Sequence, residues 1–174
     1  RSRLYAISAG IGFDALVCEL ALHAKLNTFL NRIGLGKLVY LILTVKSMRA
    51  LQVQDAYIEF EGGESYELKD MVFAAAMNQP YEGGGVPMAP DAKNDDGLLS
   101  VIFVEDIPKK KMPRMLLRLL LKKHKKIQGL RLKDTKSVRI HSDTPLVVHS
   151  DGEFCGYRTD IRFEAEKGKL RILC

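Results

Sequence analysis

The sequence contains no tryptophan and only three cysteines, and it has no apolar run of the roughly 20 residues that a membrane-spanning helix needs. Cys18, Cys155 and Cys174 are odd in number and lack metal-ligand spacing, so we expect reduced thiols in a cytoplasmic protein. Without tryptophan, and without aromatic residues among the basic ones, we expect no nucleic-acid partner. Neither a signal peptide nor an initiator Met is present, so we expect a piece of a longer protein.

The positive charge is confined to one segment. The chain has 174 residues, 47% of them hydrophobic and 28% charged, which is typical of one globular domain. Of its 27 Lys and Arg residues, nine lie in residues 109–126, which contain no acid. The other 18 are outnumbered by 21 Asp and Glu, so the net charge of +6 describes a local patch.

Apolar spacing in the first third of the chain predicts helices. Residues 15–33 and 37–51 repeat with the helical period, and we expect these two helices to pair. Residues 3–8 are predicted as a strand, followed by a glycine-rich turn at 9–14 in which Asp14 lies near a helix N-cap. A dinucleotide-binding fingerprint is disfavoured, because its third glycine is absent.

The remainder of the chain is predicted to be mainly β. Alternating or continuous apolar residues indicate strands at 56–60, 65–69, 71–77, 98–104, 138–141, 145–149, 161–164 and 169–173. Gly62-Gly63 and Asp151-Gly152 are predicted turns. Many short strands with turns between them favour a β-sandwich with inserted α-helices, formed as one domain by residues 1–174.

A long loop separates two of the predicted buried strands. Residues 78–97 contain repeated Gly and Pro, and loops of this length inside a domain are usually functional or disordered. Asp91, Asp95 and Asp96 could hold Mg²⁺ or Ca²⁺, which prefer oxygen ligands. A solvated acidic turn explains the same residues, so both interpretations stay open.

Residues 109–126 are predicted to form a basic amphipathic helix. Met112, Met115 and Leu119 share one face, whereas Arg114 and Arg118 follow another together with Lys122. Such a helix could bind an anionic membrane surface, or it could be an ordinary surface helix with a solvated charged face.

The second acidic candidate is the turn Ser150-Asp151-Gly152-Glu153. A carboxylate held between two strands could act as a general base, so Glu153 is a candidate catalytic residue. A plain hairpin would have the same sequence, because Asp-Gly is a common two-residue turn.

Several segments taken in order resemble one family. They are Ala9–Ala15, Asn78 with Gly83–Gly85, Ala89–Ala92, Asp95–Leu99 and Asp151–Glu153. Together they resemble the C-terminal half of the diacylglycerol kinase-type lipid kinases, which include YegS-like proteins and, more distantly, sphingosine and ceramide kinases. The resemblance implies a two-domain enzyme whose N-terminal, NAD kinase-like domain binds nucleotide through a Gly-Gly-Asp-Gly-Thr motif. That motif is absent from this sequence.

The resemblance also implies roles for individual residues. Glu153 corresponds to the base that takes the proton from a lipid hydroxyl as its oxygen attacks the γ-phosphate of ATP. Asp96, with the backbone carbonyls of Lys93 and Leu98, corresponds to a structural Mg²⁺ site. ATP would be bound mainly by the missing domain, and no role follows for Asp14 or Asn78.

The sequence therefore predicts the C-terminal domain of an ATP-dependent lipid kinase acting on diacylglycerol or a similar lipid. We expect the isolated chain to be inactive. The full protein is expected to be cytoplasmic and peripherally associated with membranes through residues 109–126, and a homodimer is a possible assembly. The alternative is a non-catalytic sandwich module that docks on an anionic membrane, or on an acidic partner, through the same residues.

Overall fold

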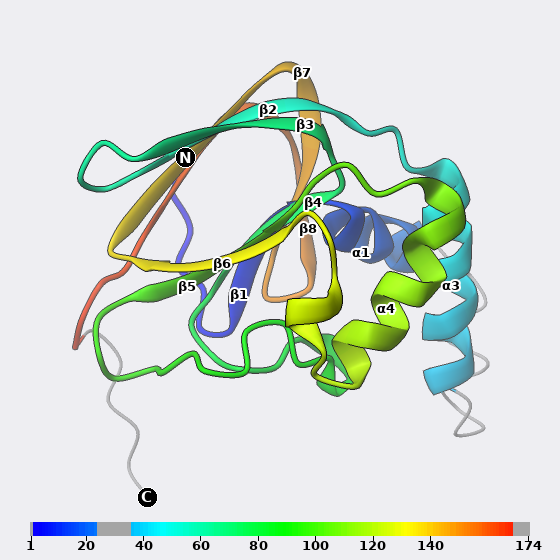
Figure 1. Cartoon of the computed structure of the whole chain (residues 1–174). Coiled ribbons are helices and arrows are strands. Elements are labelled where there is room, and N and C mark those ends of the chain that lie inside the picture. The colour runs from blue at the N-terminus through cyan, green and yellow to red at the C-terminus, as the bar shows by residue number, and fades with distance from the viewer. Residues whose placement is uncertain (1, 24–35, 169–174) are drawn as a thin grey trace, which may run out of the picture.

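The computed structural model describes residues 2–23 and 36–168 of the chain (Figure 1). The helices and strands are β1 (Ser8–Gly12), α1 (Phe13–His23), α3 (Gly36–Ala50), β2 (Gln54–Phe60), β3 (Ser65–Met71), β4 (Phe73–Met77), β5 (Leu99–Val104), α4 (Met112–Leu120), β6 (Leu130–Thr135), β7 (Ser137–Ser150) and β8 (Glu153–Glu164). Within the described residues the strands form one antiparallel sheet in the order β3-β2-β7-β1-β4-β5-β6, with β8 also paired to β7.

The long strand β7 makes the sheet curl. Near its start, Ile140 pairs with Ile58 of β2, whereas near its end, His149 pairs with Gly10 of β1. Strand β8 follows β7 along both parts. The two ends of the sheet consequently face each other, with β2 and β3 lying across the core from β5 and β6 (Figure 1). This curled sheet confirms the predicted mainly β, sandwich-like fold with inserted helices.

Strands β4 and β5 are buried on both faces. The side chains of Ala74, Ala76 and Phe103 point into the core enclosed by the curled sheet. The alternate residues, among them Phe73 and Ile102, belong to a second core formed with α1, α3 and α4. A strand covered on both faces needs apolar residues at every position, which explains the continuous apolar runs in the sequence.

The helices gather on one side of the sheet (Figure 1). Helices α1 and α3 contact each other as predicted, and the part of the predicted 15–33 helix beyond residue 23 lies outside the described residues. The predicted basic helix is shorter than expected, because α4 covers only nine residues and short 3-10 turns flank it. None of the helices described is both long enough and apolar enough to cross a bilayer.

The prediction of a strand at residues 3–8 is wrong. The strand β1 begins only at Ser8 and contains most of the segment that was predicted to be a glycine-rich turn. Gly10 and Gly12 lie inside β1, where their neighbours leave no space for a side chain. A Cβ atom on Gly12 would lie 2.6 Å from the carbonyl oxygen of Val72. Gly10 therefore serves close packing, and Gly12 serves both close packing and the positive φ at the end of β1, where the chain turns into α1.

Three other predicted strand boundaries also change. The predicted strand at 71–77 is divided at Val72, after Asp70 adopts a positive φ of 47°. The predicted strands at 138–141 and 145–149 are parts of the single strand β7, and 161–164 is the end of β8. The predicted strand at 169–173 lies outside the described residues.

Gly12 provides a test of this packing. Its φ is +90°, and Gly63 has a similar φ of +87° but has no atom within 4 Å of the position that a Cβ would take. We expect Gly63→Ala to cost about 1–2 kcal/mol of unfolding free energy from backbone strain alone. Gly12→Ala should cost about 3 kcal/mol or more, because it adds a backbone clash. Urea unfolding of both variants measures the difference, and equal losses would contradict the packing argument.

Candidate functional site

Three segments that are distant in the sequence meet beside the start of β1. They are residues 6–8, the beginning of the loop after β4, and the turn between β7 and β8. The Asp151 carboxylate is the main connection, since it accepts hydrogen bonds from the backbone N–H groups of Ala6 at 2.8 Å, Ile7 at 2.8 Å and Ser8 at 3.1 Å. The backbone N–H of Asp151 in turn donates to the carbonyl of Ser8. The turn is thereby fixed against the N-terminal segment.

Asn78 holds the same segment from the other side. Its side-chain amide donates to the carbonyl of Ala6 at 3.0 Å, and its backbone N–H donates to the carbonyl of Ile7 at 2.9 Å. Asn78 directly follows β4, which pairs with β1. Asn78, for which the sequence predicted no role, thus fixes the segment before β1 to the end of β4.

Glu153 projects from this clamped turn. Asp151 and Gly152 both have positive φ angles, 49° and 81°, which confirms the predicted tight turn. The Glu153 side chain is 69% exposed, and its Oε2 accepts a hydrogen bond from the guanidinium of Arg3. Its Oε1 makes no hydrogen bond to any part of the chain that the structure describes. One carboxylate oxygen is thus held and the other is accessible, as a general base requires.

A buried polar cluster lies close to this turn. One of its members, His149, belongs to β7, two residues before Asp151. The Nε2 atom of His149 is 3.0 Å from Oδ2 of Asp14 and 3.3 Å from Oε1 of Glu82. The side chains of His149, Asp14 and Glu82 are only 1%, 10% and 15% exposed. The hydroxyl of Ser8 also donates to Glu82. The cluster thus joins α1, β7 and the loop after β4.

Gly10 explains how the cluster forms. A Cβ atom at this position would lie 2.3 Å from Oδ2 of Asp14 and 2.8 Å from Nε2 of His149. The absent side chain leaves room for these two groups to meet above β1. Asp14 lies in the first turn of α1, and its other oxygen accepts the backbone N–H of Ala15 at 2.8 Å.

The electrostatics of the cluster follow from its excess of carboxylates. Burial alone lowers the pKa of His149, but Asp14, Glu82 and Asp151 favour the imidazolium and together raise the pKa to about 9. Burial, followed by the Asp14 charge, raises the pKa of Glu82. Burial, followed by Asp14 and Glu82, also raises the pKa of the Cys18 thiol to about 12. Cys18 is therefore a protonated, unreactive thiol.

The sequence pattern does not predict that these three residues meet. Asp14 lay in a matched segment without a role, and neither Glu82 nor His149 was selected. The chain separates them by tens of residues, and only the pairing of β1 with both β4 and β7 brings their segments together. The one usable sequence feature was Gly10, a glycine inside an otherwise apolar strand.

The predicted Mg²⁺ turn stands apart from these contacts. Oδ1 of Asp96 accepts the backbone N–H of Leu98 at 2.8 Å, and Asp96 is exposed. Its Oδ2 makes no hydrogen bond within the described residues, so it is available to a cation. Gly97 has a φ of +80°, which turns the chain sharply between Asp96 and Leu98. Asp96 and the backbone carbonyls of Lys93 and Leu98 therefore stay predicted oxygen donors for a hard cation.

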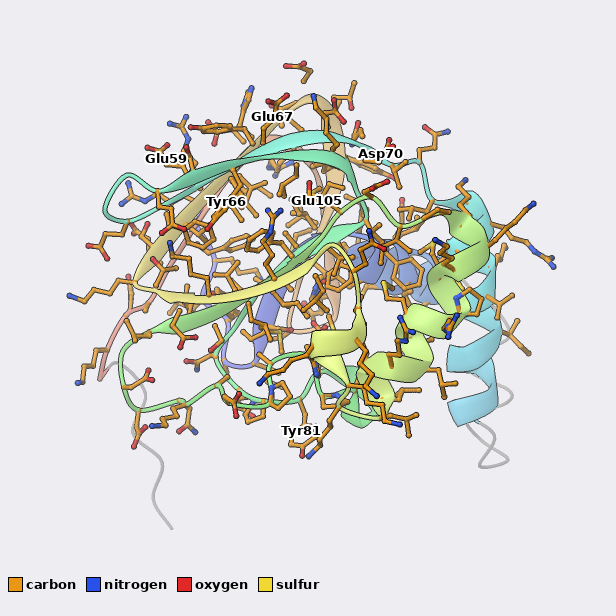
Figure 2. All side chains as sticks on the ribbon, viewed as in Figure 1. Glu59, Tyr66, Glu67, Asp70, Tyr81 and Glu105 are labelled. Atoms are coloured by element: carbon orange, nitrogen blue, oxygen red, sulfur yellow. The ribbon has the colours of Figure 1, made fainter. Side chains whose placement is uncertain are left out.

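The loop after β4 also touches the basic segment. The ammonium group of Lys122 donates to the hydroxyl of Tyr81 at 2.8 Å and lies 5.2 Å from the centre of its ring. His124 Nε2 lies 2.8 Å from the carbonyl oxygen of Pro87. Figure 2 shows Tyr81 near the C-terminal end of α4, on the outside of the molecule.

The curled antiparallel sheet, with helices on one side and a clamped polar turn, defines a β-sandwich-like domain. A family model described as the YegS C-terminal NAD kinase beta sandwich-like domain matches residues 7–174. This chain belongs to that family.

Relatives with longer chains carry lipid-kinase names. A Bacillus subtilis (strain 168) protein, YtlR, whose name proposes a lipid kinase, is 29% identical over 163 residues, covering 94% of this chain and 52% of that protein. A diacylglycerol kinase of Mycobacterium tuberculosis (strain CDC 1551 / Oshkosh) is 25% identical over 147 residues, covering 84% of this chain and 44% of that protein. The chain therefore spans about half the length of these curated relatives.

Solved structures support the fold. A Bacillus anthracis str. Sterne protein described as a proposed diacylglycerol kinase superposes with a TM-score of 0.62 at 20% sequence identity. The match covers 94% of this chain and 51% of that one. A diacylglycerol kinase structure from the same organism superposes with a TM-score of 0.55 at 16% identity.

The raised pKa of His149 predicts a dependence of stability on pH. The folded value of about 9 exceeds the usual 6.5, so the stabilisation is fully present below pH 6.5 and is lost as the pH rises through about 9. In metal-free buffer we expect the wild type to lose on the order of 3 kcal/mol more than His149→Gln between about pH 6 and pH 10. Urea unfolding across this range measures the effect, and parallel curves would contradict it.

Proposed function

We propose that this chain is the C-terminal domain of an ATP-dependent lipid kinase that transfers the γ-phosphate of ATP to the hydroxyl of diacylglycerol or a similar lipid. The observation that carries the proposal is the exposed carboxylate of Glu153 on a turn clamped by Asp151. Membership of the YegS C-terminal family and the lipid-kinase names of the relatives support it.

In this proposal Glu153 acts as the general base. Its free Oε1 takes the proton of the lipid hydroxyl, the hydroxyl oxygen forms a bond to the γ-phosphorus of ATP, and the bond to the leaving ADP oxygen breaks. Phosphoryl transfer depends mainly on positioning and on charge stabilisation. Arg3 holds Oε2, and the Asp151 clamp fixes the turn, so the base is oriented before the substrate arrives.

The remaining parts of the reaction are assigned to other groups. ATP would be bound mainly by the part of the relatives' length that this chain does not span. Asp96, with the carbonyls of Lys93 and Leu98, would hold a Mg²⁺ ion that stiffens the loop after β4. In the isolated chain the base would have no bound nucleotide to serve, so transfer should not occur.

Replacing the proposed base tests the catalytic role. In the full-length protein we expect Glu153→Gln to reduce lipid phosphorylation by a factor of about 100 or more, since it removes proton abstraction. Glu164→Gln is a matched control, because Glu164 is also an exposed, ion-paired residue of β8. Labelled ATP and a lipid panel measure transfer, and circular dichroism checks the fold. Near-normal turnover of Glu153→Gln would favour the alternative, a non-catalytic docking module.

We also propose that residues 109–126 dock on an anionic membrane surface. Met112, Met115 and Leu119 anchor α4 to the sheet and are buried. The outer side presents the basic residues together with three exposed leucines, Leu117, Leu120 and Leu121. Cations attract anionic lipid and leucines enter the headgroup region, so this surface fits an interfacial contact.

Vesicle binding tests the docking surface. Arg118 donates to the carbonyl of Lys126, and Lys122 donates to Tyr81, so replacing these two would also remove hydrogen bonds within the domain. We therefore choose Lys110, Arg114 and Lys125, which are exposed. Their triple replacement by Gln should weaken binding to phosphatidylserine-containing vesicles by a factor of about 100, at about 1 kcal/mol per charge.

The control for this experiment removes the same charge elsewhere. Lys136, Arg158 and Lys167 are exposed residues outside this segment with no ion pair in the described part of the chain, and their triple replacement by Gln should leave vesicle binding within a factor of about three of the wild type. Co-sedimentation with vesicles of increasing phosphatidylserine content provides the measurement. Equal losses in the two triple variants, or binding that ignores lipid charge, would refute the docking proposal.

A further inference from the structure

We propose that Asp14, Glu82 and His149 form a binding site for a divalent transition-metal ion such as Mn²⁺, separate from the Asp96 turn. One oxygen from each carboxylate and one imidazole nitrogen lie within 4.8 Å of one another. They come from α1, the loop after β4 and β7, so an ion bound here would connect three parts of the domain. This inference does not depend on the proposed kinase activity.

The spacing of the donor atoms suits a shared ion. Nε2 of His149 is 3.0 Å from Oδ2 of Asp14 and 3.3 Å from Oε1 of Glu82. Donor atoms bound at about 2.1 Å to one ion, with bond angles near 90°, lie roughly 3 Å apart. Gly10 keeps the space above β1 open, since a Cβ there would contact both Asp14 and His149.

The charge of the cluster also favours a cation. Two carboxylates are almost fully buried here, and His149 is their only ion-pair partner within the described residues. Burying a charge without compensation costs several kcal/mol. An imidazolium offsets one negative charge, whereas a divalent ion with a neutral imidazole offsets both. The Asp151 carboxylate nearby adds a further negative charge, although three backbone N–H groups already bind it.

The two carboxylate ligands are oriented by their own hydrogen bonds, whereas Nδ1 of His149 is buried without a hydrogen-bond partner among the described residues. The Ser8 hydroxyl donates to Glu82, and the backbone N–H of Ala15 donates to Asp14. The backbone N–H of Glu82 donates to the carbonyl of Val86, and this hydrogen bond closes a tight turn that begins at Glu82. Carboxylate ligands of metal sites are commonly held in this way. The imidazole ligand favours Zn²⁺ and similar transition-metal ions over Ca²⁺, and the two carboxylates are also suitable ligands for Mn²⁺.

Pulsed electron paramagnetic resonance of the chain with Mn²⁺ tests the site. After treatment with EDTA and addition of one equivalent of Mn²⁺, the wild type should show nitrogen modulation from one coordinated imidazole. His149→Gln should lose this modulation and bind Mn²⁺ at least about 10-fold more weakly. Asp14→Asn should weaken binding similarly, and it serves as a second variant if His149→Gln does not fold by circular dichroism.

Two controls make the outcome specific. His141→Gln removes an exposed imidazole from the same strand and should keep the modulation. Asp96→Asn alters the other predicted metal turn and should also keep it. The proposal is overturned if the wild type shows no nitrogen modulation. The cluster would then be an imidazolium that bridges two carboxylates without a metal ion. The proposal is equally overturned if the modulation persists in His149→Gln.

Discussion

The carboxylate of Asp151 is the interaction on which the candidate site depends. It accepts three backbone hydrogen bonds from Ala6, Ile7 and Ser8, and hydrogen bonds to a charged acceptor are stronger than those between neutral groups. These bonds align the segment before β1 with the β7–β8 turn. Because the turn cannot shift relative to β1, Glu153 projects into solvent while His149, two residues before Asp151, remains buried.

The site consequently has two levels with opposite requirements. At the surface, Glu153 keeps one oxygen free, which suits proton transfer to a substrate. Beneath it, the Asp14, Glu82 and His149 cluster is enclosed and needs a proton or an ion to offset its charge. The two levels adjoin the same turn between antiparallel strands, since His149 lies just before it in β7 and Glu153 just after it in β8.

The sequence was sufficient for the elements whose pattern is local. The continuous apolar runs of β4 and β5 indicated buried strands, which the structure shows to be covered on both faces, and Asp151-Gly152 indicated the turn. Strand β1 was misplaced because Gly10 and Gly12 resemble turn residues, although close packing against distant groups requires them. The buried cluster could not be predicted either, since the strand pairing that assembles it is set by long-range contacts that leave no local periodicity.

The loop after β4 links the surface contacts to the buried ones through two consecutive residues. Tyr81 is 46% exposed and binds Lys122 at the end of the basic segment, whereas Glu82 turns inward to Ser8 and His149. The backbone at Glu82 is part of a tight turn, because Glu82 and Val86 are joined by backbone hydrogen bonds in both directions. A contact that displaces Lys122 would break its hydrogen bond to Tyr81, the chain neighbour of the cluster residue Glu82. If residues 109–126 dock on a membrane, Tyr81 and Glu82 connect that surface to the candidate site through one hydrogen bond and one peptide bond.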